Sequence, residues 1–492
     1  MTKPSPERAL IVLVTVAVGL GMAFGVCTQD DAFISFRYAE NLAEGNGLVY
    51  NVGERVEGFT NLSWTLLFGL IMMLGGEPVL ASVFLGWLSI AALVTVTWRF
   101  ARDLMTPWAA VVAAAFVALD TPMILEGVEG LETVTYAVLV TMGILTGWRE
   151  GGGAKSAGWF AAATLTRPEA PLIWGATQLA LWAREGGFVV RLKNGIGSVW
   201  PLGLTLVLLT AWRLSYYGEW LPNTFYAKTG GVAVSRGVSY LMAHAESHPV
   251  LWIAVLASIA VTARRVRSLA IIVAVVCTYI VWVGGDFKPT GRFVIPVLPV
   301  LAVLAAAFLE EVWAKPAVRR WLIPTMLLVF AWARWVQYGQ ANGWAEERHA
   351  NLQARQLVGD WLALNTPQDT VIAVHSAGVV PYYAGRKTID MWGLTNKQVA
   401  RTAVDGMGTG MAGHERSAPE YVFSLKPDIY LPEDKLFTLR PWRLERETGV
   451  SQDFEEHYRV VNVPIEGRWL NMWVRKDGPL HQLRLVDGAM EG

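Results

Sequence analysis

The sequence predicts a polytopic α-helical membrane protein with about eleven transmembrane helices and a small C-terminal extracytoplasmic α/β domain. Of its 492 residues, 53% are hydrophobic and only 17% are charged, which is too apolar for an ordinary soluble protein of this length. The apolar residues gather in uncharged segments up to about residue 335, and the sequence after that is mixed and polar. We therefore expect a membrane domain at 1–338 and an α/β domain at 340–492.

The charge balance and the cysteines exclude some classes of protein. Lysine and arginine together number 41, as do aspartate and glutamate, so no net basic field favours a nucleic-acid partner. Cys27 and Cys277 lie in or beside apolar segments and show neither a metal-binding spacing nor a disulfide framework. The sequence therefore argues against a nucleic-acid-binding protein, a zinc-binding protein and a disulfide-rich protein.

The N-terminal segment 9–26 is uncharged and follows Lys3 and Arg8, which is the pattern of a signal peptide or of a first transmembrane helix. Gly25 and Val26 precede Cys27 without the small residues of a lipoprotein signal, and we interpret the segment as an uncleaved helix. In either case the basic residues place the N-terminus in the cytoplasm and the following residues outside.

The next stretch, 28–78, is predicted to be the first outer loop. Residues 30–43 are predicted to form a short helix that an aspartate caps and that Gly45 and Gly47 end. Residues 62–74 are apolar but short for a span, so we expect a helix that lies on the outer interface.

The remaining apolar segments supply ten further spans. Segments 157–165 and 170–183 flank Arg167 and Glu169, which an uninterrupted helix would bury, so we interpret them as half-length helices that meet at a break. The other predicted spans are 79–98, 107–125, 133–148, 196–216, 250–263, 269–283, 293–309 and 321–335. This count places basic loops, such as those with Arg99, Arg149 and Arg319, on the cytoplasmic side, as the positive-inside rule requires.

The C-terminal part has its own secondary-structure signals. Segments 370–374 and 428–431 are predicted to be strands, and 351–364 is predicted to be an amphipathic helix. Because the N-terminus is expected in the cytoplasm and the predicted spans number eleven, this part is expected on the extracytoplasmic side. The membrane is expected to be the cell (inner) membrane.

Asp30 and Asp31 are two adjacent carboxylates at a predicted membrane surface, where an ionised group is costly unless it is solvated, paired or used. A carboxylate can accept the proton of an attacking hydroxyl group. One aspartate can equally serve as the helix cap, and a proton relay or a metal ligand is chemically compatible, although no histidine or further ligand stands at a diagnostic spacing. Asp30 and Arg37 share a helix face, which also fits a plain ion pair.

Other charged residues gather on the same predicted face of the membrane. The glycine-rich loop 284–293 brings Asp286 and Arg292 together, and it also reads as a connecting turn. Lys228 can bind a phosphate or extend to lipid headgroups, and Glu57 is unremarkable in an exposed loop. Transfer of a group from a lipid-linked phosphate requires a carboxylate to accept a proton and arginine or lysine to stabilise the charge of the phosphate, and both kinds of residue gather here.

Several motifs together resemble bacterial GT-C glycosyltransferases, with the terminal β-arabinofuranosyltransferase group of mycobacterial and related cell walls as the nearest likeness. These motifs are DDAFI at 30–34, GNGLVYN at 45–51, GERVEGFTN at 53–61, TRPE at 166–169, LPNTFYAK at 221–228, GGDF at 284–287 and IDMWGLT at 389–395. The resemblance implies a GT-C-like fold and a transferase that takes a sugar from a polyprenyl-phosphate donor outside the cytoplasm. It also implies an active-site carboxylate in the first outer loop.

We therefore predict that Asp30 and Asp31 are catalytic, with Asp31 favoured as the base. We predict substrate or donor binding by Arg37, Glu57, Asn61, Arg167, Glu169, Asn223, Lys228, Asp286 and Arg292. The predicted partners are a polyprenyl-phosphate-linked sugar donor, a cell-envelope glycan acceptor and membrane lipid, and no nucleic acid. No cofactor is required by the residues, and a divalent cation is compatible with the carboxylates.

Two other classes of function fit the same sequence. A transporter or flippase for a lipid-linked sugar would show two related halves with broken helices at corresponding positions, and the break at 166–169 has no such counterpart. A non-catalytic scaffold of an envelope-assembly complex would tolerate removal of the charges at Asp30, Asp31, Asp286 and Arg292.

Overall fold

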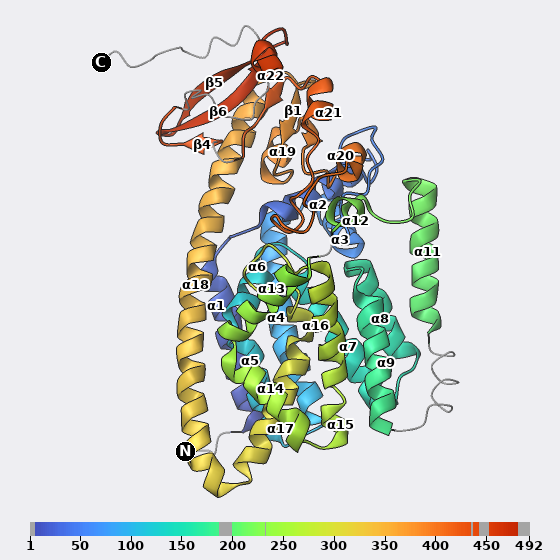
Figure 1. Ribbon diagram of the computed structural model, residues 1–492, viewed down its shortest axis with the longest axis vertical. Helices are drawn as coiled ribbons and strands as arrows, with labels where there is room; N and C mark the ends of the chain where they lie inside the picture. The colour runs from blue at the N-terminus through green and yellow to red at the C-terminus, as the bar shows by residue number, and fades with distance from the viewer. Residues whose placement is uncertain (1–4, 186–198, 232, 434–435, 442–451, 481–492) are drawn as a thin grey trace.

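The computed structural model describes residues 5–185, 199–231, 233–433, 436–441 and 452–480. The molecule is elongated, with a helical body at one end and a small sheet at the other (Figure 1). The chain starts at the far end of the body, and α1 (Pro6–Phe24) leads to α2 (Asp30–Ala43), which lies next to the sheet-bearing part. Ser5 and Pro6 begin α1, and Gly25 ends it with a φ of 69°.

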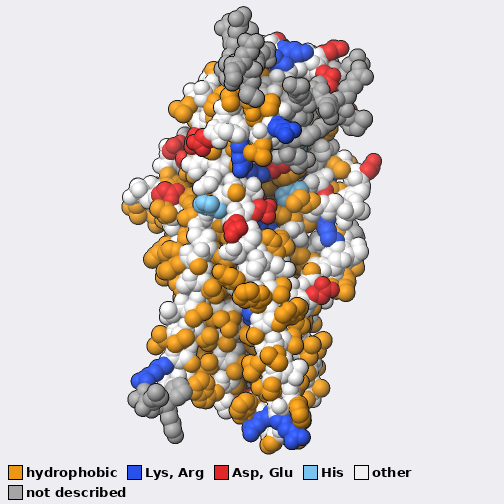
Figure 2. Space-filling view, turned by 90° about the vertical axis from the view of Figure 1, so that its left-hand side faces the viewer, with side chains coloured by type: hydrophobic (Ala, Val, Ile, Leu, Met, Phe, Trp, Pro, Cys, Tyr) orange, Lys and Arg blue, Asp and Glu red, His pale blue; other side chains and the backbone are white. Residues whose placement is uncertain are grey.

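The helical body is built from helices that are mostly apolar. After α2 these are α3 (Leu62–Met73), α4 (Pro78–Arg102), α5 (Pro107–Ala118), α6 (Thr121–Val128), α7 (Thr133–Glu150), α8 (Ala154–Thr166), α9 (Ala170–Glu185), α11 (Trp200–Tyr216), α12 (Asn223–Lys228), α13 (Val234–Ser247), α14 (Pro249–Val261), α15 (Arg264–Arg267), α16 (Ala270–Val283), the 3-10 turn η1 (Ile295–Val297) and α17 (Leu298–Trp313). Hydrophobic side chains dominate the surface of this body, and Lys and Arg gather at its far end (Figure 2).

The number of spans stays a prediction. Among the described residues, three helices are long and apolar enough to cross a membrane, namely α1, α4 and the η1–α17 helix Ile295–Trp313. The count rises to five if the bent pairs α5–α6 and α13–α14, which turn by 58° and 102°, each form one span. The predicted span 196–216 starts outside the described residues, and α11 accounts for the rest of it.

One predicted element agrees with the observed structure and another differs. The helices around Arg167 meet at a break as predicted, because α8 and α9 lie side by side and residues 166–169 form the turn between them (Figure 1). The predicted helices 321–335 and 351–364 belong to one helix, α18 (Pro316–Asn365), of 50 residues. α18 thus runs through the predicted domain boundary near residue 340, and neither Gly339 nor Gly343 interrupts it.

The C-terminal part carries a six-stranded mixed sheet. Its elements are β1 (Val371–Val374), α19 (Val379–Ala384), β2 (Lys387–Asp390), α20 (Lys397–Arg401), α21 (Pro419–Ser424), β3 (Ile429–Tyr430), β4 (Phe437–Thr438), α22 (Gln452–His457), β5 (Tyr458–Ile465) and β6 (Arg468–Arg475). The strand order is β2-β1-β3-β6-β4, with β5 also paired to β6. β1 is parallel to β2 and β3, whereas β6 is antiparallel to its neighbours.

The predicted strands at 370–374 and 428–431 correspond to β1 and β3. They lie side by side in the sheet, so the chain after each strand emerges at the same edge. Residues 375–378 and 431–433 follow these strands, and both segments face α2 across a shared cavity.

Candidate functional site

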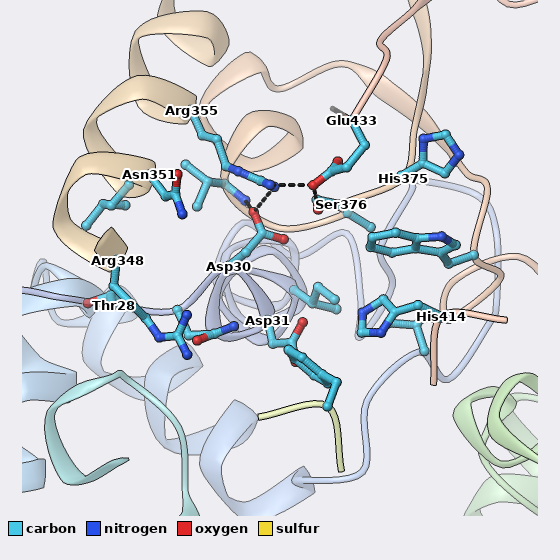
Figure 3. A pocket seen from close by; sticks show the side chains of 18 of the residues that line it. Thr28, Asp30, Asp31, Arg348, Asn351, Arg355, His375, Ser376, His414 and Glu433 are labelled. Carbon is cyan, nitrogen blue, oxygen red and sulfur yellow. Dashed lines mark hydrogen bonds and ion pairs between the residues drawn. The ribbon is translucent and has the colours of Figure 1, made fainter. Parts of the chain in front are cut away.

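The main polar cavity lies where α2, α18 and the C-terminal part meet, and its volume is about 180 Å³. Asp30 and Asp31 line it from the start of α2, and Arg355 lines it from α18 (Figure 3). Glu433 and His414 line it from loops of the C-terminal part. The two carboxylates that the sequence singles out therefore do face a cavity.

Asp30 is held by the C-terminal part of the chain. Its carboxylate accepts hydrogen bonds from the backbone N–H groups of Gly378 and Val379, both at 3.0 Å, and so caps the start of α19. Asp30 does not cap its own helix, because the residue before α2 is Gln29, whose side chain makes no capping bond. The expected aspartate cap of residues 30–43 is therefore wrong, and the Asp30 side chain instead joins two distant elements.

An ion-pair chain completes the surroundings of Asp30. Arg355 lies 3.1 Å from Asp30 and 2.5 Å from Glu433, and Ser376 donates a hydrogen bond of 2.7 Å to Glu433 (Figure 3). Burial raises the pKa of Asp30, and the positive charge of Arg355 opposes that rise. With three donors already bonded to it, this carboxylate has little capacity left to accept a proton from a substrate.

Asp31 has the opposite surroundings. No described residue donates a hydrogen bond to its carboxylate or forms an ion pair with it. Burial alone would raise its pKa, but the charges of Lys228 and Arg292, with a contribution from His414, lower the pKa below the ordinary value of 3.8. Asp31 is therefore a charged and unoccupied carboxylate that faces the cavity, as a general base must.

Two cations from other parts of the chain act on Asp31. The ammonium group of Lys228, at the end of α12, has no ion-pair partner in the described part of the chain. Arg292 forms an ion pair of 2.7 Å with Asp286, its neighbour in the glycine-rich loop, and the negative charge of Asp286 raises the pKa of Arg292 against the effect of burial. These two cations are the groups suited to hold a phosphate beside Asp31.

A layer of buried ion pairs lies under the site. Lys288 contacts both Glu126 and Glu129, and all three side chains have no exposed surface. Arg348 of α18 lies 2.5 Å from Glu129, and the backbone N–H of Gln29 donates to the carbonyl of Glu129 at 2.9 Å. This layer fixes the start of α2 and the glycine-rich loop against the helical body.

Arg167 and Glu169 lie in a second and smaller group. Arg167 is 2.9 Å from Glu169 and 3.2 Å from Glu132, and Asn61 donates to the same Glu132 at 2.9 Å. Arg167 and Arg292 line one small cavity of about 20 Å³. The predicted residues Arg167 and Glu169 thus line a cavity with Arg292, and neither they nor Asn61 line the main cavity.

An apolar groove continues from that small cavity along the helical body. Its volume is about 600 Å³, and Leu172, Trp174, Leu179 and Trp182 of α9 line it together with Val275 of α16. Leu172 lines the small cavity as well, so the groove begins next to Arg167. The lining is almost entirely apolar, which suits a hydrocarbon chain.

Three predicted binding residues have structural contacts instead. Arg37 is buried and donates to the backbone carbonyls of Tyr50, Pro381 and Arg386, so its guanidinium joins α2 to the C-terminal part. Glu57 is buried in an ion pair of 2.7 Å with Arg213.

Asn223 donates to the carbonyls of Gly393 and Leu394 at 2.7 and 3.0 Å. The guanidinium of Arg37, the carboxylate of Glu57 and the amide of Asn223 are all bonded to other groups of the protein. We therefore do not carry these three residues into the functional proposal.

Sequence reasoning missed the residues that surround the carboxylates from the other side. Arg348 and Arg355 are seven residues apart, which places them on one face of α18, and this spacing was a signal that could have been used. Glu433, Ser376 and His414 come from loops with no local pattern that indicates a site. Among the described residues, no group of three or more His, Cys, Asp or Glu side chains is arranged to hold a metal ion.

Comparison with known proteins adds sequence relatives and a fold. A family described as a domain of unknown function (DUF8728) matches residues 343–479. The chain is 23% identical over 373 residues to a terminal β-(1→2)-arabinofuranosyltransferase of Corynebacterium glutamicum, covering 64% of this chain and 53% of that protein. It is 28% identical over 278 residues to the protein of the same name from Mycobacterium tuberculosis, covering 48% and 41%. The chain thus spans about half the length of the curated relatives it matches.

Solved structures share the fold over nearly the whole chain. The apo structure of ArnT from Cupriavidus metallidurans matches with a TM-score of 0.61 and 14% identity, covering 94% of this chain and 97% of that one. The same protein bound to undecaprenyl phosphate matches with a TM-score of 0.59 and 13% identity. The Archaeoglobus fulgidus oligosaccharyltransferase matches with a TM-score of 0.51 and 12% identity, covering 79% and 65%. The resemblance to GT-C glycosyltransferases that the motifs predict is therefore confirmed, in the sequence relatives and in the fold.

Proposed function

We propose that this protein is a membrane glycosyltransferase that moves a sugar from a polyprenyl-phosphate donor to a hydroxyl group of a glycan acceptor. Arabinofuranose is the donor sugar we favour, because both curated relatives are named for its transfer. We place the reaction on the extracytoplasmic face of the inner membrane, on a cell-envelope glycan. One observation carries the proposal: an unoccupied carboxylate, Asp31, lies beside the unpaired cation Lys228 at the surface of an apolar helical body.

The reaction assigns a separate task to each charged group. Asp31 accepts the proton of the acceptor hydroxyl as its oxygen bonds to the anomeric carbon of the donor sugar. The bond between that carbon and the phosphate oxygen breaks, and its electron pair stays on the polyprenyl phosphate, which gains one negative charge. Lys228 and Arg292 stabilise this charge as it develops. Asp30 orients the start of α2, and the ion pair with Arg355 keeps it there.

The apolar groove beside α9 suits the polyprenyl chain of the donor. It begins at Leu172, which also lines the small cavity that Arg167 and Arg292 share. A phosphate bound by Arg292 and Lys228 would therefore let a hydrocarbon chain follow the groove along the helical body. Burial of such a chain contributes about 0.8 kcal/mol for each CH₂ group that leaves water, and less where lipid is the alternative.

A transfer assay in proteoliposomes tests the proposal. The purified protein is supplied with polyprenyl-phosphate arabinofuranose and a short arabinan acceptor, and the product is detected by mass spectrometry. The expected result is an acceptor longer by one sugar, together with free polyprenyl phosphate. Movement of the intact donor lipid between leaflets without a glycosidic product would contradict the proposal and support a transporter.

A further inference from the structure

The motif at 389–395 forms a rigid loop, and none of its residues takes part in the proposed reaction. Asp390 accepts hydrogen bonds from the backbone N–H groups of Trp392, Gly393 and Thr395 at 2.8 to 3.0 Å. A Cβ atom at Gly393 would lie 2.6 Å from the nitrogen of Ala400, so the loop is tightly packed there. Asn223 donates to the carbonyls of Gly393 and Leu394 in the same loop. These contacts fix the backbone from which the Trp392 side chain projects.

Trp392 lines the main cavity together with His414, and their rings are 4.3 Å apart and nearly perpendicular. A tryptophan ring offers a wide apolar face and one N–H donor, a combination that suits the apolar C–H face of a sugar ring. Across the cavity, Asn351 projects from α18 (Figure 3). Its amide has no hydrogen-bond partner among the described residues and can both donate to and accept from a hydroxyl group.

Carboxylates outnumber the positive charges of this cavity. Arg348 is paired with Glu129, and the single charge of Arg355 is shared between Asp30 and Glu433, so the lining offers a ligand anion no excess positive charge. Asp31 is the unpaired charge among the described residues of the lining, and it is negative. An anionic ligand would therefore meet repulsion here, in contrast to the cationic side of Asp31 at Lys228 and Arg292.

The size of the cavity fits a single sugar residue. The cavity volume of about 180 Å³ leaves room for one pentose or hexose residue. The site thus has a cationic side, at Lys228 and Arg292, and an aromatic side without excess positive charge, at Trp392 and His414.

We propose that the cavity between Trp392, His414 and Asn351 is the acceptor subsite and that it takes an uncharged sugar residue. The sugar ring packs on Trp392, Asn351 bonds one of its hydroxyl groups, and the reacting hydroxyl reaches Asp31. This inference rests on the proposed transferase function, and it further states that acceptors with an acidic terminal residue are rejected.

Two measurements test the inference in the full-length protein in nanodiscs. Equilibrium binding of an arabinofuranose disaccharide, followed by isothermal titration without donor, is compared for the wild type, Trp392→Ala and Asn351→Ala. We expect Trp392→Ala to weaken binding by about tenfold, which corresponds to about 1.4 kcal/mol. Asn351→Ala should weaken it less, while binding of undecaprenyl phosphate stays unchanged in both variants. Trp220→Ala, at a tryptophan that is 67% exposed and outside the cavity, is the matched control.

The charge of the ligand supplies the second measurement. The terminal phosphate ester of the same disaccharide should bind at least about tenfold more weakly than the neutral form, and the Asp31→Asn variant should reduce that difference. Equal binding of the two forms would overturn the inference, as would a loss of lipid-phosphate affinity without loss of disaccharide affinity in Trp392→Ala. Because binding is measured without turnover, failure of the transfer assay alone would overturn the proposed function and leave a binding site for a neutral sugar without its role as acceptor subsite.

Discussion

Asp30 and Asp31 are neighbours in the sequence and have opposite surroundings in the fold. Asp30 is bonded by Gly378, Val379 and Arg355, whereas no described residue pairs with Asp31. Successive side chains on a helix point about 100° apart, so adjacent carboxylates at its start need not share partners. This difference assigns the structural task to Asp30 and leaves Asp31 for chemistry.

The effect of Lys228 on Asp31 predicts a change in the pH dependence of transfer. Lys228 lowers the pKa of Asp31 against the effect of burial, so in the wild type the base stays ionised at mildly acidic pH. In Lys228→Ala that pKa rises, and the acidic limb of the kcat/KM profile should move to higher pH. The rate at neutral pH should also fall, by about 10²-fold, because one cation no longer stabilises the leaving phosphate.

Lys387→Ala is the matched control for this measurement, because Lys387 pairs with Glu54 and lies outside the cavity. Its pH profile should equal that of the wild type. An acidic limb that stays in place in Lys228→Ala would show that Lys228 does not act on the base.

The candidate residues show where sequence reasoning stops. The sequence identified Asp30, Asp31, Lys228 and the Asp286–Arg292 pair because each stands in a loop between apolar segments, where charge is conspicuous. It could not separate these from Arg37, whose partners at Pro381 and Arg386 lie more than 340 residues away. Partners at such a separation are set by the tertiary fold and leave no local pattern.

At the scale of elements, the contact between α2 and the start of α19 is the joint between the two parts of the molecule. A Cβ atom at Gly378 would lie 1.9 Å from the backbone oxygen of Asp30, so no side chain fits there. Gly378→Ala should therefore separate the two elements and lower the melting temperature, at a cost of roughly 1–3 kcal/mol. Gly343→Ala on α18, where a Cβ meets nothing within 4 Å, is the control and should leave the melting temperature unchanged or raised.

Melting followed by intrinsic fluorescence in detergent measures this effect. If Gly378→Ala has the melting temperature of the wild type and retains full transfer activity, the contact between Asp30 and α19 does not hold the site together.

The groove beside α9 leads to a prediction about the length of the donor lipid. Gly175 lines the groove, and a Cβ atom there meets nothing within 4 Å, so the side chain of Gly175→Trp has room to enter the groove. The KM for a long polyprenyl donor should rise about tenfold, while the KM for a donor with a two-isoprene chain should stay the same. The matched control is Gly158→Trp, on α8, where a Cβ also meets nothing within 4 Å and which does not line the groove. Equal effects on both donors would place the lipid elsewhere.

At the scale of the whole molecule, the order of helices was predictable and their arrangement was not. Apolar length indicated α1, α4, α7 and α11 from the sequence, and the outer helix α2 was placed at its observed bounds, 30–43. The joining of two predicted helices into α18 escaped prediction because the polar stretch 337–350 continues the helix without an apolar face to mark it. The short strands β2 and β4 are defined by their neighbours in the sheet, which hydrophobic alternation over two to four residues cannot reveal.

The predicted orientation places the sheet end of the molecule outside the cell and the turn between α17 and α18 inside. Met411 at the sheet end is 56% exposed, and Val318 at the start of α18 is 45% exposed. With Cys27 and Cys277 replaced by alanine, Met411→Cys should react with a membrane-impermeant maleimide on intact cells, and Val318→Cys should react only after the membrane is opened. The reverse pattern would invert the predicted topology and move the site to the cytoplasmic face.

The most direct test of the central claim compares two substitutions of equal size and charge at adjacent positions. Asp31→Asn and Asp30→Asn are assayed for transfer in proteoliposomes, with the melting temperature of each variant measured in parallel. We expect Asp31→Asn to lower kcat by about 10²- to 10⁴-fold with an unchanged melting temperature, because only the base is lost. Asp30→Asn should lower the melting temperature and retain measurable turnover. Normal turnover in Asp31→Asn would contradict the assignment of Asp31 as the base.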